Sequence, residues 1–380
     1  MKKYIAVLLA VFISACSNDN ALDLPEIGRV QAVVATIAAD YLSGAHSIVG
    51  ETAGEYAALN ELAPGGSDVF VASYGSFYYI VDRSAESVTK YAFSNPGEVI
   101  WQFTTKNSAT DTGSNPHAMV FVNDQKAYIL RYGKTTAWIV NPSALIEADF
   151  KIGELDLSAY SGTDGIPDMD NGVVVGNQLF IAMQRLENFS PSALAYIAVF
   201  DINTDIEIDT NTDSVNGFNG IPLEVRNPFS DVVYDNDSGL IYVQAFGSFF
   251  SPQFTGGVEV INPITYASSI VLDDGDETTH PYGNIASFAI RSATSAYFVG
   301  YDGFTDNNLY KFNPTTKAVE QSSIAALQDV QISNIIFDNS GRLWVSDSSN
   351  ATVYIINADT DEVIDMVSTV LNPGTVAFPN

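Results

Sequence analysis

VYIINADT (residues 353–360) is the stretch that decides the fold of this chain, because its pattern is repeated along most of the sequence. A short apolar strand is followed by Asn or Asp and then by a polar turn. The pattern occurs five more times, as KYAFSNP (90–96), AWIVNP (137–142), AVFDINT (198–204), VEVINP (258–263) and LYKFNP (309–314). The marking Asn and Asp residues are 44 to 61 residues apart. A period of this length predicts an array of four-stranded units.

Two more series of apolar strands precede these markers, so each unit has strands a, b and c, followed by a more variable strand d. The b strands read YYIVD, KAYILRY, QLFIAMQ, LIYVQAF, SAYFVGY and RLWVSD, and the a strands read DVFVAS, AMVFVND, DNGVVVGN, DVVYDNDSG, NIASFAI and NIIFDNSG. The C-terminal NPGTVAFPN (372–380) is typical of a lone a strand, whereas residues 30–50 supply b and c strands with no a strand before them. The sequence therefore predicts an all-β, seven-bladed β-propeller with four antiparallel strands per blade, closed by pairing of its N- and C-terminal strands.

The repeated unit, with its Tyr-aliphatic strand and its Asp/Asn-Pro-x-Thr turn, resembles that of YVTN/YncE-type propellers over residues 29–380. The architecture is also similar to that of surface lipoproteins that capture vitamin B12 for a TonB-dependent outer-membrane transporter. This similarity implies a nutrient-capture accessory, a TonB-dependent transporter as partner, and a small anionic or metal-containing ligand. It brings no ligand-contact motif that can be matched here, because blade repeats specify architecture better than function.

The N-terminus predicts a lipoprotein. Lys2 and Lys3 precede an apolar run of ten residues (4–13), and Ile13-Ser14-Ala15-Cys16 resembles a bacterial lipobox. Residues 1–15 are then a signal peptide, 16–28 a lipidated tether beginning at Cys16, and 29–380 a single propeller domain. Acyl chains at Cys16 would anchor the protein in the outer membrane, facing the periplasm or the exterior. Ser17 favours the outer membrane by the same resemblance.

The composition excludes several classes of function. The formal net charge is −29, which disfavours nucleic acid and anionic membrane surfaces as partners. Cys16 is the only cysteine, so the propeller has neither disulfides nor a cysteine nucleophile. The three histidines, His46, His117 and His280, form no recognisable triad with a serine. The sequence thus favours a role without catalysis and predicts no catalytic residue.

The loops that join b to c strands are long and aromatic, at 131–138, 184–196, 245–257 and 301–308. In a propeller these loops share one face with the d-to-a connections, and enlarged loops on one face often carry recognition. We expect a ligand-binding face there; its aromatic members are Tyr132, Phe246, Phe249, Phe250 and Tyr301. The alternative is that these rings fold back over the blade ends.

Four of the seven arginines, Arg83, Arg131, Arg185 and Arg226, fall near the ends of b strands or in a d-to-a loop. They are predicted to lie on the same face, where a guanidinium can hold a carboxylate or phosphate by two hydrogen bonds. The alternative, which the neighbouring carboxylates favour slightly, is local ion pairing.

Two sets of oxygen-bearing side chains are candidates for a metal, with Ca²⁺ the ion that such ligands suit. The first set is aligned at the start of the a strands and comprises Asp68, Asp170, Asp231, Asn284 and Asn334. The second is Asp209, Asn211 and Asp213, a partial match to a calcium loop. In both cases capping of backbone groups by Asp and Asn is the favoured alternative, so no cofactor is certain.

The combined features favour an outer-membrane-anchored binding propeller over two alternatives. One is a metal-dependent hydrolase of lactonase type that uses the Asp/Asn ring, and the other is a passive envelope scaffold.

Overall fold

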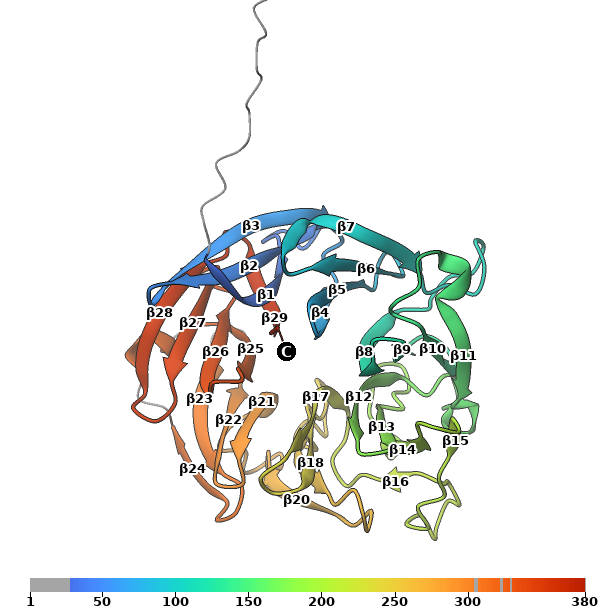
Figure 1. Ribbon diagram of the computed structural model, residues 1–380. Helices are drawn as coiled ribbons and strands as arrows, with labels where there is room; N and C mark the ends of the chain where they lie inside the picture. The colour runs from blue at the N-terminus through green and yellow to red at the C-terminus, as the bar shows by residue number, and fades with distance from the viewer. Residues whose placement is uncertain (1–27, 304–306, 322–323, 329, 380) are drawn as a thin grey trace, which may run out of the picture.

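The computed structural model describes residues 28–303, 307–321, 324–328 and 330–379, which form an all-β propeller. Seven antiparallel sheets stand around a central axis, each with its a strand innermost (Figure 1). The predicted fold class and blade count are confirmed. Within the described residues, helical structure is limited to the 3-10 turns η1 (Glu147–Asp149), η2 (Ser158–Tyr160) and η3 (Ala325–Leu327). No helix in this part of the chain is long and apolar enough to span a membrane.

The first four blades are listed here from the axis outward. Blade 1 contains β29 (Asn372–Ala377), β1 (Arg29–Ile37), β2 (Gly44–Thr52) and β3 (Glu55–Gly65). Blade 2 contains β4 (Val69–Tyr74), β5 (Phe77–Asp82), β6 (Ser87–Ala92) and β7 (Asn95–Thr104). Blade 3 contains β8 (Pro116–Asn123), β9 (Lys126–Arg131), β10 (Thr136–Val140) and β11 (Lys151–Asp156). Blade 4 contains β12 (Met169–Val175), β13 (Gln178–Met183), β14 (Tyr196–Asp201) and a divided outer strand, β15 (Ile206–Glu207) with β16 (Ile221–Pro222).

The other three blades are regular. Blade 5 contains β17 (Pro228–Asp235), β18 (Leu240–Ala245), β19 (Gly257–Ile261) and β20 (Ser268–Asp273). Blade 6 contains β21 (Asn284–Ser292), β22 (Ser295–Tyr301), β23 (Asn307–Asn313) and β24 (Ala318–Gln321). Blade 7 contains β25 (Ile332–Phe337), β26 (Arg342–Asp347), β27 (Thr352–Asn357) and β28 (Glu362–Ser368).

The ring closes through blade 1, where the two ends of the chain pair with each other. The C-terminal strand β29 lies antiparallel to β1, with Val33 opposite Ala377 and Ile37 opposite Asn372. β29 is therefore the innermost strand of a blade whose other three strands begin the propeller, as predicted from the two ends of the sequence.

The repeated Asn or Asp holds the c-to-d turn with its side chain in five of the six blades that carry it, whereas Asn95 begins β7 and donates to Glu98. Asp201 Oδ1 accepts the N–H groups of Asn203 and Thr204, both at 2.9 Å. Asn262 Oδ1 likewise accepts the N–H groups of Ile264 and Thr265. Asn and Asp favour such turns because their short side chains reach backbone donors two or three residues on.

Adjacent blades are joined by apolar seams and by a polar clasp that repeats. In the seam between blades 3 and 4, Leu130 and Leu179 are among the fully buried side chains. Burying one such side chain completely contributes about 1.5–3 kcal/mol. At the edge of this seam Asp205, in the c-to-d turn of blade 4, accepts hydrogen bonds from Tyr128 Oη (2.8 Å) and Lys126 Nζ (2.7 Å). The Tyr of the b-strand pattern thus fastens one blade to the next.

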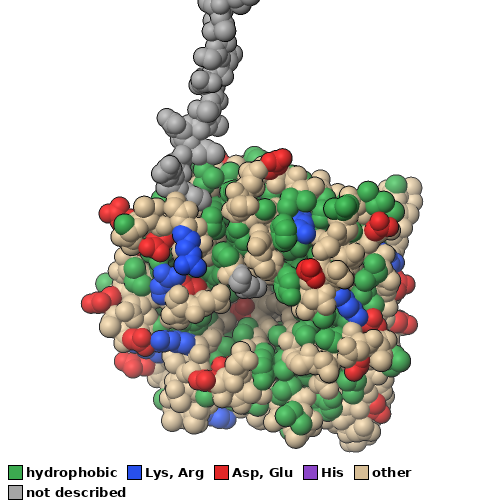
Figure 2. Space-filling model, viewed as in Figure 1, with side chains coloured by type: hydrophobic (Ala, Val, Ile, Leu, Met, Phe, Trp, Pro, Cys, Tyr) green, Lys and Arg blue, Asp and Glu red, His purple; other side chains and the backbone are tan. Residues whose placement is uncertain are grey.

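The b-to-c and d-to-a connections lie at one end of the strands and define what we call the loop face. The a-to-b and c-to-d turns lie at the other end, the turn face. Viewed along its axis, the disc has a hollow at its centre, and acidic side chains are spread around its rim (Figure 2).

Candidate functional site

A cavity of about 580 Å³ opens on the loop face around the propeller axis, and we call it the loop-face pocket. Its size falls within the range of about 300–1,000 Å³ that is common for sites of small molecules. Connections of six blades reach it. Its lining comprises Tyr41, His117, Tyr132, Gln184, Leu186, Phe189, Asn227, Phe229, Phe246, Phe249, Ala286, Tyr301, Asn307, Gln331, Ile332, Ser333 and Ser348.

Aromatic rings form much of the wall. Phe246 packs against Phe249 and Tyr301, with ring centroids 4.5 and 5.9 Å apart. On the other side Tyr132 stacks on His117 at 4.2 Å, with the two ring planes only 19° apart. Broad apolar walls of this kind supply binding energy for a ligand, while a few polar groups orient it.

Several rings at the mouth of the pocket are exposed. Phe249 is 66% exposed, and Phe189 is 82% exposed at a positive φ of 63° in the b-to-c loop of blade 4. Phe250, next to Phe249, is also exposed. Phe254 of the same loop instead folds back and stacks on His280 at 3.9 Å. Exposed rings grouped at a cavity mouth are typical of a binding surface.

Of the aromatic residues predicted for the ligand-binding face, Tyr132, Phe246, Phe249 and Tyr301 do line this pocket. Phe250 is exposed beside it and is not part of the lining. The structure thus brings four of the five together, although no ligand tests the role assigned to them.

The four predicted arginines lie outside the lining of the loop-face pocket. Arg131 is fully buried, with its guanidinium 4.6 Å from the centroid of the Trp138 ring and one hydrogen bond to Asn107 Oδ1 at 3.0 Å. Arg185 donates to the carbonyl oxygens of Tyr160 (2.8 Å) and Leu194 (2.9 Å). These two side chains hold the loops of their own blades through hydrogen bonds and ring contacts, and among the described residues neither forms the carboxylate ion pair that the alternative anticipated.

Of the remaining two arginines, Arg83 is paired through its side chain, whereas Arg226 Nη1 is buried without a hydrogen-bond partner among the described residues. Arg83 forms an ion pair with Asp68, 3.1 Å between Nη1 and Oδ1. Arg226 is half-buried, and burial lowers the pKa of its guanidinium. Its backbone N–H donates to the carbonyl of Thr255, which joins a d-to-a loop to the long b-to-c loop of blade 5.

A second cavity of about 190 Å³, the channel cavity, lies among the inner strands and shares His117 with the loop-face pocket. Asp170, Asp231 and Asn334 line it. Asp170 accepts a hydrogen bond from the Ser230 N–H at 2.7 Å, and its other oxygen lies 2.7 Å from His117 Nδ1. Burial lowers the pKa of His117 and raises the pKa of Asp231 to about 7.

The predicted metal ring is assembled only in part. Asp170, Asp231 and Asn334 share the channel cavity, but Asp68 is paired with Arg83. Asn284 is buried and donates to the carbonyl of Phe246 at 2.8 Å, which is the capping role that was the alternative. In the described part of the chain, no three His, Cys, Asp or Glu side chains are grouped closely enough to hold a metal ion.

The partial calcium-loop motif lies between the two halves of the outer strand of blade 4. Asp209 Oδ1 accepts the N–H of Asn211 at 2.9 Å, and Asp213 accepts the N–H groups of Val215 and Asn216 and the Tyr196 hydroxyl. These oxygens stabilise turns of the loop. Cys16, the predicted lipidation site, lies outside the described residues.

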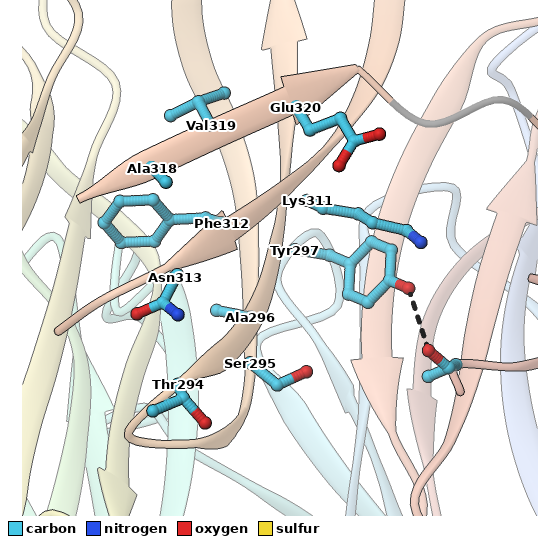
Figure 3. Close-up of a pocket in the computed structure, with 11 residues that line it drawn as sticks. Thr294, Ser295, Ala296, Tyr297, Lys311, Phe312, Asn313, Ala318, Val319 and Glu320 are labelled. Atoms are coloured by element: carbon cyan, nitrogen blue, oxygen red, sulfur yellow. Dashed lines mark hydrogen bonds between the residues drawn. The ribbon is translucent and has the colours of Figure 1, made fainter. Parts of the chain in front are cut away.

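A third hollow, of about 380 Å³, lies between blades 6 and 7, and we call it the interblade groove (Figure 3). Its polar groups have partners in the next blade. The Tyr297 hydroxyl reaches the Ala358 carbonyl and Asp361, and Lys311 pairs with Asp361. This is the same clasp as at Tyr128 and Asp205, so the groove is a structural joint.

The sequence analysis missed His117, Gln184, Phe189 and Asn307 as pocket residues. A usable signal was present, because the residue directly after a b strand lines the pocket in four blades: Tyr132, Gln184, Phe246 and Ser348. Side chains of successive residues in a strand point to opposite sides. The prediction chose Arg185, one residue from Gln184, and so chose the side that faces away from the axis.

Comparison with known proteins supports the fold. The chain matches no protein-family profile and no curated protein sequence. Among solved structures it is similar to BF1038 of Bacteroides fragilis, a protein proposed to be a 6-phosphogluconolactonase, with 12% identity over 94% of this chain and 99% of that one (TM-score 0.58). It is also similar to apo AztD of Citrobacter koseri, with 12% identity over 91% and 97% of the two chains (TM-score 0.52). A third similar structure is the dihydro-heme d1 dehydrogenase NirN in complex with DHE, with 11% identity over 92% and 75% (TM-score 0.52). At such identities the likeness shows a shared propeller fold and nothing finer.

Proposed function

We propose that this chain is a non-catalytic, YncE-like envelope lipoprotein that captures a small molecule in the loop-face pocket. The observation that carries the proposal is the pocket itself, which combines about 580 Å³ of volume, a wall of aromatic rings and exposed rings at its mouth. Rings exposed to water are costly unless they meet a ligand or a partner. The lipobox ending in Cys16 supports an anchor in the outer membrane.

A membrane partner fits the same proposal. Phe189, Phe249 and Phe250 are exposed on the loop face, where they can contact a second protein while the pocket is filled. A TonB-dependent transporter is the partner that the lipoprotein resemblance suggests, and the strongly negative charge of the chain argues against nucleic acid in that role.

The test is capture of a molecule from a native extract. The purified chain is incubated with a small-molecule extract of the source cells, re-isolated, denatured, and analysed by mass spectrometry for released compounds. Ala286→Phe fills the pocket, while Ala318→Phe places the same added ring at the interblade groove and serves as the matched control. We expect one compound to be retained by the wild type and the control and lost at least tenfold in Ala286→Phe. Equal retention by all three proteins, with unchanged melting temperatures, would exclude the pocket as the site of capture.

The channel cavity supports a second candidate, a metal-dependent hydrolase of lactonase type. Asp170, Asp231 and Asn334 share this cavity, and Asn334 Oδ1 is buried with no hydrogen-bond partner in the described chain. Oxygen ligands of this kind suit Ca²⁺. Equilibrium dialysis with Ca²⁺, compared between the wild type and Asp231→Ala, together with a lactone-hydrolysis assay, tests this candidate. Absence of both binding and turnover removes it.

A further inference from the structure

The loop-face pocket is electrically neutral in a chain of net charge −29. Among the described residues of its lining there is no Asp, Glu, Lys or Arg. His117 is the one residue of this lining whose type often titrates near neutral pH. Its Nδ1 lies 2.7 Å from Asp170 Oδ1. A charged ligand would lose its hydration in this pocket without gaining an ion pair, which is unfavourable. The lining therefore selects an uncharged ligand.

The polar side chains of the lining are hydroxyls, one imidazole and four amides, and three of these amides have polar atoms without a partner in the described part of the chain. Gln184 is only 2% exposed, and neither atom of its side-chain amide has a hydrogen-bond partner in the described part of the chain. Asn227 and Asn307 are buried, and each has a carbonyl oxygen without a partner. Buried polar groups are nearly always hydrogen-bonded in folded proteins, so unpartnered ones grouped around a cavity require an explanation.

The contrast with other buried amides shows that the fold is able to satisfy such groups. Gln244 is also fully buried; its Nε2 donates to the carbonyl of Ile285, while its Oε1 has no partner among the described residues. Asn284 donates to the carbonyl of Phe246 and accepts from Gln253. Gln184 differs in lining the pocket, where a bound molecule can supply its partner.

A primary amide has one donor and one acceptor side by side. Its complement is a molecule with an N–H next to a C=O, as in a lactam, which forms two parallel hydrogen bonds with it. The flanking rings, including the stacked pair His117 and Tyr132, favour a flat aromatic body because offset stacking adds to apolar burial.

We propose that the loop-face pocket takes a neutral, flat heteroaromatic molecule whose lactam-type edge pairs with the amide of Gln184. This inference rests on the proposed capture function and adds the chemical class of the ligand. Gln184 belongs to blade 4 and the stacked rings of His117 and Tyr132 to blade 3, so the preference for this class of ligand requires that the blades are assembled.

A matched set of three-ring probes tests the inference. Phenanthridin-6(5H)-one carries a lactam edge, its N-methyl derivative lacks the N–H, and phenanthrene-9-carboxylate is an anion of similar shape. Dissociation constants are measured by fluorescence titration for the wild type, for Gln184→Leu, and for Gln125→Leu. Gln125 is an exposed turn residue and provides the same chemical change away from the pocket. A melting curve of each variant confirms that it is folded.

We expect the wild type and Gln125→Leu to bind phenanthridinone at least tenfold more tightly than its N-methyl derivative, and to bind the carboxylate most weakly. In Gln184→Leu the tenfold preference should fall to about threefold or less, mainly through weaker binding of phenanthridinone.

The outcomes separate the inference from the proposed function. If all neutral probes bind equally and Ala286→Phe abolishes their binding, the pocket binds ligands and the lactam preference is wrong. Tightest binding of the carboxylate would also overturn the inference. If no probe binds, the ligand class is wrong, and the proposed function then depends on the extract experiment alone.

Discussion

The interblade groove and the loop-face pocket are both open hollows, and they differ in what their polar side chains contact. In the groove, Tyr297 and Lys311 find Asp361 in the neighbouring blade. In the pocket, the amide of Gln184 finds no partner in the described chain. Under the proposed capture function, hydrogen-bond satisfaction distinguishes a structural joint from a binding site better than the size of a hollow does.

The largest expected loss of stability is at the interblade groove, where Asp361 joins blades 6 and 7. Asp361→Gly removes the acceptor of the clasp, and Gly tolerates the positive φ of 59° at this position. Because the buried Tyr297 hydroxyl and Lys311 lose their anion, we expect the free energy of unfolding to fall by about 2 kcal/mol. Urea unfolding measures this effect. Probe binding in the loop-face pocket should not change; a loss of binding would mean that the groove and the pocket are coupled.

The second prediction concerns pH and a carboxyl beside the pocket. Burial raises the pKa of Asp168 from its ordinary value of 3.8 to about 7, and its Oδ2 accepts the N–H of Leu186 at 2.7 Å. The folded chain therefore keeps this proton at pH values where the unfolded chain has lost it. The contribution of Asp168 to the free energy of unfolding falls as the pH rises from about 4 to about 7 and is constant above that.

Asp168→Asn removes this titration, and Asn tolerates the positive φ of 55° at this position. We expect the free energy of unfolding at pH 8 to rise by on the order of 1 kcal/mol, and its decline between pH 4 and pH 7 to become less steep. Unfolding curves across that range test both points. The exposed turn residue Asp237 does not contribute to the shifted pKa of Asp168, so Asp237→Asn is the control and should leave the pH profile as in the wild type.

The third prediction is that a substitution in the pocket raises the free energy of unfolding, whereas most substitutions lower it. Gln184→Leu replaces a buried amide that has no partner with an apolar group of similar size, so the free energy of unfolding should rise by about 0.5–1 kcal/mol. Gln244→Leu is the matched comparison, because it removes a hydrogen bond to the Ile285 carbonyl and should destabilise by a similar amount. If both variants lose stability, Gln184 is satisfied in the free protein and the comparison between groove and pocket breaks down.

The smallest effect is expected from an exposed charge in the same turn as Asp361. Asp359 pairs with Arg291 across blades 6 and 7 but is 70% exposed. Such surface pairs contribute little, so Asp359→Ala should lower the free energy of unfolding less than any change above, and this loss should vanish in 1 M salt. A loss as large as that of Asp361→Gly would show that charge rather than burial determines the strength of the joint.

The fold could be predicted from the sequence because each blade repeats the same strand pattern with an Asn or Asp near its c-to-d turn. Asn357 and its five counterparts mark the c-to-d turns, and this local chemistry is visible without tertiary information. The ends were predictable for a related reason. The N-terminal end supplies b and c strands without an a strand, and the C-terminal end supplies an a strand without the strands that should follow it. Neither end can form a blade alone, so the two must share one.

The site was less predictable because which residues reach the pocket depends on the register of the strands and on how deeply each side chain is buried. The candidate metal set treats Asn284 as equivalent to Asp231, because each lies three residues after a proline, Pro281 and Pro228, but the structure starts β17 at Pro228 and β21 at Asn284. The d-to-a loop before blade 6 thus shifts the register by three residues, and Ser287, not Asn284, hydrogen-bonds to Asp231. Loop length is set by contacts that no local pattern reports. The missing partner of Gln184 is equally invisible in a sequence, since it is defined by what surrounds the amide in space.

The pairing of β29 with β1 has a consequence for the order of events during biosynthesis. Since the innermost strand of blade 1 is β29, the last strand of the propeller, the ring cannot close until β29 has been made. Joining two distant ends is also the step with the greatest loss of chain entropy. Strands β1 to β28 therefore form an open array until β29 pairs with β1, and this pairing completes the disc.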